Sequence, residues 1–85
     1  MKKFTAAVDI TLRKGILDVQ GKTVEHALHS IDFTAIHNVR MGKFVEFIVD
    51  AENQQQAQSI ATNACEKLIA NPIMEDYHIS VSEAA

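Results

Sequence analysis

The sequence has few of the residues that small proteins use for cross-linking or for chemistry. Its 85 residues include one cysteine, one proline, three glycines and no tryptophan. A single cysteine excludes an internal disulfide framework, and no clustered ligand set suggests a structural metal in its place. Gly15, Gly21 and Gly42 are dispersed and match no phosphate-binding loop. Disulfide cross-linking and independent nucleotide binding are therefore poor explanations of this chain.

Long apolar runs and an excess of basic residues are also missing. No stretch approaches the roughly 18 apolar residues that a membrane span requires. The start Met1-Lys2-Lys3 leads into an alternating segment and not into an apolar signal core. With a formal net charge of −3, the chain lacks the positive charge that supplies most affinity for nucleic acid. We expect a cytoplasmic protein with no membrane and no nucleic-acid partner.

The chain does have a large apolar fraction for its size. Apolar residues make up 47% of the sequence, which favours a folded chain over a disordered one. We expect a single domain over residues 1–85, which would bury only about 60 to 65% of the surface of its unfolded chain. Since neither disulfides nor a metal can support so small a core, we expect a homo-oligomer, either a dimer or a tetramer.

Apolar alternation predicts four strands. The longest alternating segments cover residues 4–12, 43–50 and 77–81, and a shorter segment covers residues 36–40. Gly42 can adopt the positive φ of a tight turn, so the second and third strands are expected to form a hairpin.

Apolar spacing of the helical kind predicts two helices. The first runs from about residue 22 to 32, and the second begins at the N-cap Asn53 and ends where Pro72 prevents its continuation. The order βαββαβ then favours an α+β, ferredoxin-like sandwich. In it, both helices pack on one face of a four-stranded antiparallel sheet.

One face of such a sheet would be left bare. If Val45, Phe47 and Val49 face the helices, the residues between them face outward beside the polar side of the first strand. Contiguous apolar surface usually marks an interface, so we expect self-association through Phe44, Ile48 and Ala7.

Residues that could carry chemistry have simpler structural explanations. Cys65 lies within the second helix, where a free cysteine is usually a small buried hydrophobe. His26 and His29 share a helix face, but a metal site needs a third or fourth ligand, and none is evident. The acidic residues Asp9, Glu46, Glu75 and Asp76 are best explained as solvated surface. We predict no catalytic, cofactor-binding or metal-binding residue.

RNA recognition is one alternative, because the RNA-recognition module has the same order of elements. Arg40, Phe44, Val45 and Phe47 fit its strand-three signature at the first, fifth, sixth and eighth positions. Gly42, however, stands where a stacking aromatic belongs, which breaks the stacking platform.

An acylphosphatase-like enzyme is the other alternative, because that family holds an anionic substrate in the loop after its first strand. The segment Val19-Gln20-Gly21 is faintly similar to that loop. The family's arginine after the glycine is missing, since Lys22-Thr23-Val24-Glu25 follows here. The phosphate cradle would thus lack its main cation.

Three segments in order resemble the PurS family along nearly the whole chain. Residues 8–22 contain Asp18-Val19-Gln20-Gly21-Lys22, which is similar to the family's Asp-Pro-Gln-Gly-Lys loop with Val19 in place of proline. Residues 39–46 resemble the family's hairpin, with glycine and lysine followed by a glutamate. Residues 65–77 resemble the end of its second helix, the proline stop and the acidic turn.

PurS is the small subunit of the multi-subunit formylglycinamide ribonucleotide amidotransferase, or phosphoribosylformylglycinamidine synthase. The resemblance implies a non-catalytic subunit of purine biosynthesis that joins the glutaminase subunit PurQ to the ATP-dependent synthetase subunit PurL and supports ammonia transfer. It implies no cofactor in this chain, whereas the complex would use ATP and Mg²⁺. As contacts to the large subunits we expect the exposed polar residues of the loop and hairpin: Asp18, Gln20, Lys22, Arg40, Lys43 and Glu46.

Overall fold

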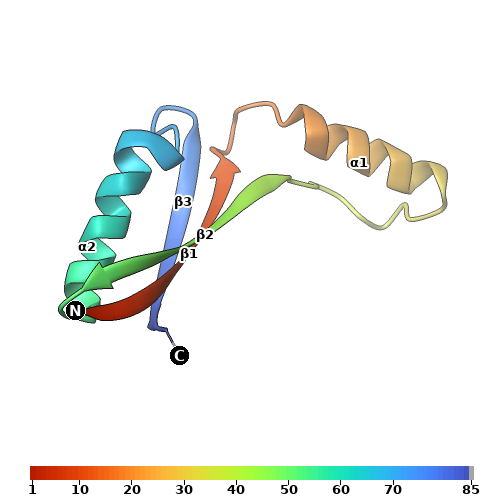
Figure 1. The fold of residues 1–85 in the computed structure, drawn as a ribbon. Helices are drawn as coiled ribbons and strands as arrows, with labels where there is room; N and C mark the ends of the chain where they lie inside the picture. The colour runs from red at the N-terminus through yellow and green to blue at the C-terminus, as the bar shows by residue number, and fades with distance from the viewer. Residues whose placement is uncertain (85) are drawn as a thin grey trace.

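A computed structural model describes residues 1–84 and shows an α+β fold (Figure 1). Strand β1 (Lys2–Leu12) is the central strand of the sheet, flanked by the antiparallel strands β2 (Gly42–Ala51) and β3 (Glu75–Glu83). Helix α1 (Val19–Ser30) follows β1. Helix α2 (Gln54–Ala64) follows β2 and continues into the π-helical turn η1 (Cys65–Ile69). The predicted α+β class is confirmed.

The core lies between α2 and one face of the sheet. The central strand contributes Phe4, Ala6, Val8 and Ile10, all buried, and α2 contributes the fully buried Ala57 and Ala61. Alanine at these two positions lets the helix backbone lie close to the strands. The inward-facing residues of β2 are those that alternation predicted, with Val49 buried and Val45 and Phe47 packed against the core.

Helix α2 begins where the sequence predicts, and its π-helical continuation η1 ends at Ile69, shortly before the predicted stop at Pro72. The Asn53 side chain accepts a hydrogen bond from the backbone N–H of Gln56 at 2.8 Å, and the Gln56 side chain accepts one from the N–H of Glu52 at 2.6 Å. These two bonds satisfy N–H groups that have no partner within the helix. At the other end, the N–H of Ala70 bonds to the carbonyl of Cys65 at 3.0 Å, and Pro72 follows two residues later.

The prediction of a four-stranded sheet is wrong for residues 1–84, in which three strands form the sheet. The segment 36–40 is not a strand, because two of its backbone groups bond to side chains of α1. The N–H of Val39 donates to Glu25 Oε1 at 3.1 Å, and the ring of His29 bonds to the carbonyl of Ile36 at 2.7 Å. Asn38 has a φ of 58°, which interrupts an extended strand.

The predicted hairpin turn at Gly42 is also wrong, because β2 continues straight out of the preceding segment. Gly42 does not have a positive φ, and glycine is required there for a different reason. A Cβ at this position would lie 2.2 Å from the carbonyl oxygen of Ile10 on β1. Glycine therefore allows β2 to lie close to β1 at the point where the two strands begin to pair.

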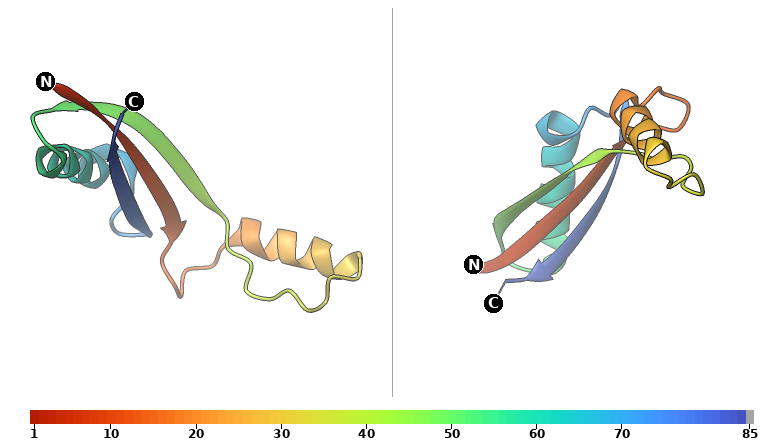
Figure 2. Two further views of the ribbon diagram at one scale, coloured as in Figure 1. Left: turned by 90° about the horizontal axis from the view of Figure 1, so that it is seen from below. Right: turned by 90° about the vertical axis from the view of Figure 1, so that its right-hand side faces the viewer.

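The prediction that both helices pack on one face of the sheet is wrong for the first helix, because α1 does not cover the sheet. Helix α1 and residues 31–41, which we call the strap, extend together away from the sheet as an arm (Figure 2). The molecule measures 52 × 29 × 14 Å with a radius of gyration of 16.5 Å. A compact domain of this length would have a radius of gyration of about 12 Å. No helix in the described part of the chain is long and apolar enough to cross a membrane.

Candidate functional site

Asp18 joins the start of α1 to the strap. Its Oδ1 caps the helix by accepting from the N–H of Gly21 at 2.9 Å, and its Oδ2 accepts from the N–H of Met41 at 2.7 Å. The N–H groups of Gly21 and Met41 lower the pKa of this carboxyl because they stabilise its charged form. Asp18 thus has a structural role at the base of the arm.

Gly21 is the only buried residue of α1 among those described. A Cβ here would lie 2.2 Å from the carbonyl oxygen of Val39 and 2.7 Å from Oδ2 of Asp18. Only glycine lets the strap approach the first turn of the helix this closely. The pairing of Asp18 with Gly21 in the loop motif therefore has a direct physical reason.

Three of the other expected contact residues lie near this junction. Gln20 and Lys22 are exposed on the first turn of α1, and the guanidinium of Arg40 donates to the carbonyl of Leu12. Lys22 and Arg40 line a groove of about 490 Å³ between the loop after β1, the start of α1 and the strap. Arg13 and Lys14 line the same groove, so its walls carry four positive side chains beside the carboxylates of Asp18 and Glu25.

The last two expected contact residues lie on opposite faces of β2. Lys43 Nζ is 3.3 Å from Oε2 of Glu75 on the face that packs against α2. Glu46 is exposed on the other face, opposite Ala7 of β1. The expected contact residues are thus divided between the arm and two faces of the sheet and do not form one compact site.

The sheet face away from α2, which we call the open face, contains the residues predicted for self-association. Phe44 and Ile48 lie on β2 with 63% and 56% of their surface exposed, on either side of Glu46. Ala7 lies beside them on β1, paired with Glu46 in register. The structure therefore brings the three residues together, and their role in self-association stays a prediction.

The arm exposes an apolar surface that the sequence did not predict. Ile31, which belongs to the apolar spacing that predicted the first helix, is 62% exposed, and other apolar side chains of the arm are exposed with it. The exposed residues are Leu17 just before the arm, and Val19, Ile31, Phe33, Ile36 and Met41 on it. Of these residues only Ile31 belongs to the helical spacing, so that spacing does not account for most of the exposed apolar surface.

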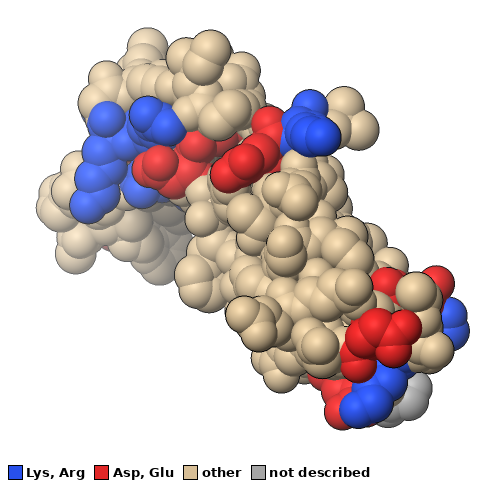
Figure 3. Space-filling model, turned by 90° about the vertical axis from the view of Figure 1, so that its left-hand side faces the viewer, with Lys and Arg blue, Asp and Glu red and all other residues tan. Residues whose placement is uncertain are grey.

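Charge is distributed unevenly on the face that carries α2. Figure 3 shows the Lys, Arg, Asp and Glu side chains gathered toward the ends of this face, with uncharged surface between them. Helix α2 itself has no charged residue over Gln54–Ala64. Such depletion of charge is typical of surfaces that other proteins contact.

Cys65 is fully buried, as predicted, and burial raises the pKa of its thiol, which disfavours the reactive thiolate. The histidines group differently from His26 and His29, the two that share a helix face in the sequence pattern. Within residues 1–84, His29 has Glu25 and His37 as its neighbours in a group of possible metal ligands, and His26 is not among them. The sequence missed this group because His37 lies in residues 36–40, which were expected to form a strand of the sheet.

Comparison with known proteins identifies the family. Residues 5–83 match the profile of PurS, described as phosphoribosylformylglycinamidine (FGAM) synthase. The chain belongs to the PurS family. The resemblance seen in the three sequence segments is thereby confirmed, and it places the chain among the PurS subunits of FGAM synthase in purine biosynthesis.

Relatives and solved structures agree with this assignment over almost the full length of PurS. The PurS subunit of Bacillus subtilis is 35% identical over 80 residues, which cover 94% of each chain. The crystal structure of PurS from Methanocaldococcus jannaschii superposes with a TM-score of 0.86 at 32% identity, covering 96% of this chain and 99% of the other. A chain in the structure of PurLQS from Thermotoga maritima gives a TM-score of 0.88 at 33% identity, covering 96% and 100%.

Val19 is the one residue that differs from the family's Asp-Pro-Gln-Gly-Lys loop motif, and its position in α1 explains why the change is tolerated. Val19, where the family's proline is expected, is the first residue of α1 after the N-cap Asp18. Proline is well tolerated at that position because the N–H it lacks has no partner within the helix. Valine keeps the helix start, so the substitution leaves the geometry of the junction intact.

Proposed function

We propose that this chain is the non-catalytic assembly subunit of FGAM synthase, which joins the glutaminase subunit PurQ to the synthetase subunit PurL and supports ammonia transfer between them. The observation that carries the proposal is the arm, whose apolar residues project away from the core without covering the sheet. The likeness to the chain in PurLQS from Thermotoga maritima supports the same partners. Family membership favours this role over the RNA-binding and acylphosphatase alternatives.

The chemistry of the complex gives assembly a purpose. Ammonia released from glutamine becomes protonated in water and then ceases to be a nucleophile, so the two active sites must be held in register. A subunit that only positions its partners can supply a large part of the rate in this way. In this proposal ATP and Mg²⁺ are bound by the larger subunits, and this chain contributes contact surface.

Reconstitution tests the assembly role. PurL and PurQ are mixed with ATP, Mg²⁺ and formylglycinamide ribonucleotide, and glutamine-dependent product is followed with and without this chain. We expect activity to require the chain. We also expect Phe33→Asp, which places a charge on the exposed apolar surface of the arm, to reduce recovery of the complex on size exclusion at least tenfold.

Ile73→Asp is the matched control, because Ile73 is an exposed apolar residue outside the arm, with 80% of its surface accessible. It should leave complex recovery unchanged. Equal glutamine-dependent activity without the chain would contradict the assembly role, and full recovery with Phe33→Asp would contradict the part assigned to the arm.

We further propose that the chain forms a homo-oligomer, a dimer or a tetramer, through the open face. Phe44 and Ile48 expose a paired apolar surface beside Ala7, and burying them against a second copy removes that surface from water. Sedimentation velocity at micromolar concentration should show an oligomer for the wild type and a monomer for Phe44→Asp.

Leu68→Asp provides the control for this experiment, since Leu68 lies on η1 away from the open face and is 87% exposed. It should sediment as the wild type does. A monomeric wild type, or an unaltered oligomer of Phe44→Asp, would show that the open face is not the self-association surface.

A further inference from the structure

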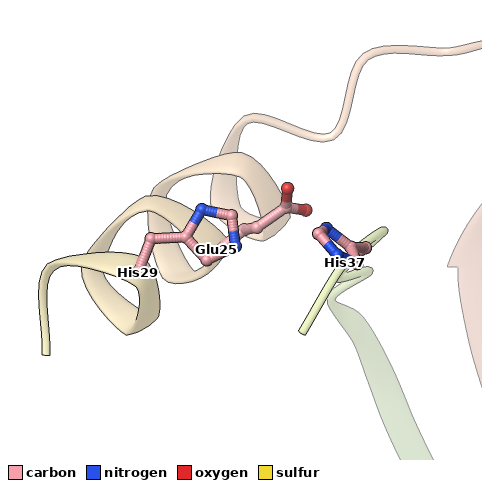
Figure 4. A group of neighbouring side chains, drawn as sticks. All are labelled: Glu25, His29 and His37. Atoms are coloured by element: carbon pink, nitrogen blue, oxygen red, sulfur yellow. The ribbon is translucent and has the colours of Figure 1, made fainter. Parts of the chain in front are cut away.

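Three side chains on the arm lie close enough together to hold a metal ion (Figure 4). Glu25 and His29 are four residues apart on α1 and thus share one face of the helix. His37 reaches the same place from the strap. One ligand atom from each residue, a carboxylate oxygen and two ring nitrogens, lies within 4.8 Å of the others.

The backbone of the strap holds these side chains in position. The N–H of Val39 donates to Oε1 of Glu25 at 3.1 Å and leaves its other oxygen available. This N–H lowers the pKa of Glu25, so the carboxyl is charged at neutral pH. Asn38, with its positive φ, lies between His37 and Val39 in the chain. The ring of His37 and the N–H of Val39 both approach the carboxylate of Glu25. Outer contacts of this kind are what orient ligands in metal sites.

The two imidazoles are already arranged side by side. Their ring centroids are 5.8 Å apart, with an angle of 72° between the ring planes. His29 Nε2 is 2.7 Å from the carbonyl oxygen of Ile36 and must donate to it, since a carbonyl only accepts. His29 is therefore held against the strap with its lone pair on Nδ1. A metal bound at Nε2 instead requires the proton to move to Nδ1 and the hydrogen bond to Ile36 to break.

The ligand set indicates the kind of ion. Two imidazoles and one carboxylate suit zinc and the neighbouring divalent metals, whereas Mg²⁺ and Ca²⁺ prefer oxygen ligands alone. Tetrahedral ligands about 2.0–2.1 Å from zinc lie about 3.4 Å from one another. Side chains at the surface of the arm can reach this spacing from 4.8 Å by small rotations. Three protein ligands leave a fourth position open to water or to a partner's side chain.

We propose that Glu25, His29 and His37 bind one zinc-type divalent ion that clamps the strap to α1. The site joins two segments that otherwise depend on hydrogen bonds at Asp18, Glu25 and His29. Bound metal would stiffen the arm at the place where it displays its apolar residues.

Titration with Co²⁺ tests the site, because tetrahedral Co²⁺ absorbs visible light and is displaced by Zn²⁺. The protein is used without an affinity tag, freed of metal with a chelator, and titrated with Co²⁺ alone. We expect one Co²⁺ per chain, displacement by Zn²⁺ but not by Mg²⁺, and at least a tenfold loss of affinity for His37→Ala and for His29→Ala. Far-ultraviolet circular dichroism confirms that the variants remain folded.

His26→Ala is the matched control, because His26 lies on the same helix outside the group of three. It should bind Co²⁺ as the wild type does. Absence of stoichiometric Co²⁺ binding by the wild type would overturn the proposal. Unchanged affinity in both His29→Ala and His37→Ala, or an equal loss in His26→Ala, would overturn it as well.

Discussion

Replacing Ile10 by alanine should lower the free energy of unfolding by about 2–5 kcal/mol, because it removes buried methyl and methylene groups and leaves a cavity. Ile10 is 1% exposed and is one of the largest fully buried side chains of the described residues. It lies on the central strand, between β2 and β3, and belongs to the core cluster that includes Val8 and Cys65.

Such a loss is large for this chain. A domain of 85 residues has a total unfolding free energy of about 4–13 kcal/mol, and here the core is confined to one helix and one sheet face. Urea unfolding followed by far-ultraviolet circular dichroism measures the change. The protein concentration must be the same for all variants, because association adds to apparent stability.

Ile73→Ala is the matched comparison, since it deletes the same atoms from a side chain that is 80% exposed. Its unfolding free energy should stay within about 0.5 kcal/mol of the wild type. If Ile10→Ala were no more destabilising than Ile73→Ala, the cluster of Ile10 with Val8, Cys65 and Ala70 would not be a main source of stability.

Replacing Gly21 by valine should release the strap from α1. The added Cβ would lie 2.2 Å from the carbonyl oxygen of Val39 and 2.7 Å from Oδ2 of Asp18, and the first of these is a backbone atom that cannot rotate away. Valine is a better helix former than glycine by only a few tenths of a kcal/mol, which is too little to offset this clash. The strap must therefore move.

Hydrogen exchange measures the release directly. The N–H groups of Val39 and Met41 donate to Glu25 and Asp18 across the junction, so both should exchange at least tenfold faster in Gly21→Val. Amides on β1 should be unaffected, because the arm makes little contact with the sheet.

Gln20→Val places the same side chain at the neighbouring, exposed position of α1. Protection of Val39 and Met41 should remain at the level of the wild type in this variant. Wild-type protection in Gly21→Val would show that the close approach of the strap to Gly21 does not hold the arm together.

The elements that pack against one another were predictable, because buried positions recur along a strand or helix with a regular period that is visible in the sequence. Strand β1, the inward residues of β2 and the burial of Cys65 follow from that period alone. The start of α2 also follows from local chemistry, since the Asn53 and Gln56 side chains bond to nearby backbone groups. Family membership was predictable from three motifs whose order is as informative as their residues.

The arm was not predictable from the same signals. The short alternation over residues 36–40 is what an edge strand would show, but these residues bond to side chains of α1. Nothing in the loop motif reveals that Met41, 23 residues after Asp18, donates to it. The Glu25, His29 and His37 group was missed for the same reason.

Local sequence was sufficient to predict which residues of β1 and β2 face the core, where α2 starts, and which family the chain resembles, because each of these depends on neighbours close along the chain. Three features could be seen only in the folded chain: α1 leaves the sheet, the strap lies along α1, and three strands form the sheet of residues 1–84. Those outcomes depend on contacts between residues far apart in sequence, and an apolar period is the same whether the surface is covered by its own sheet or by another protein.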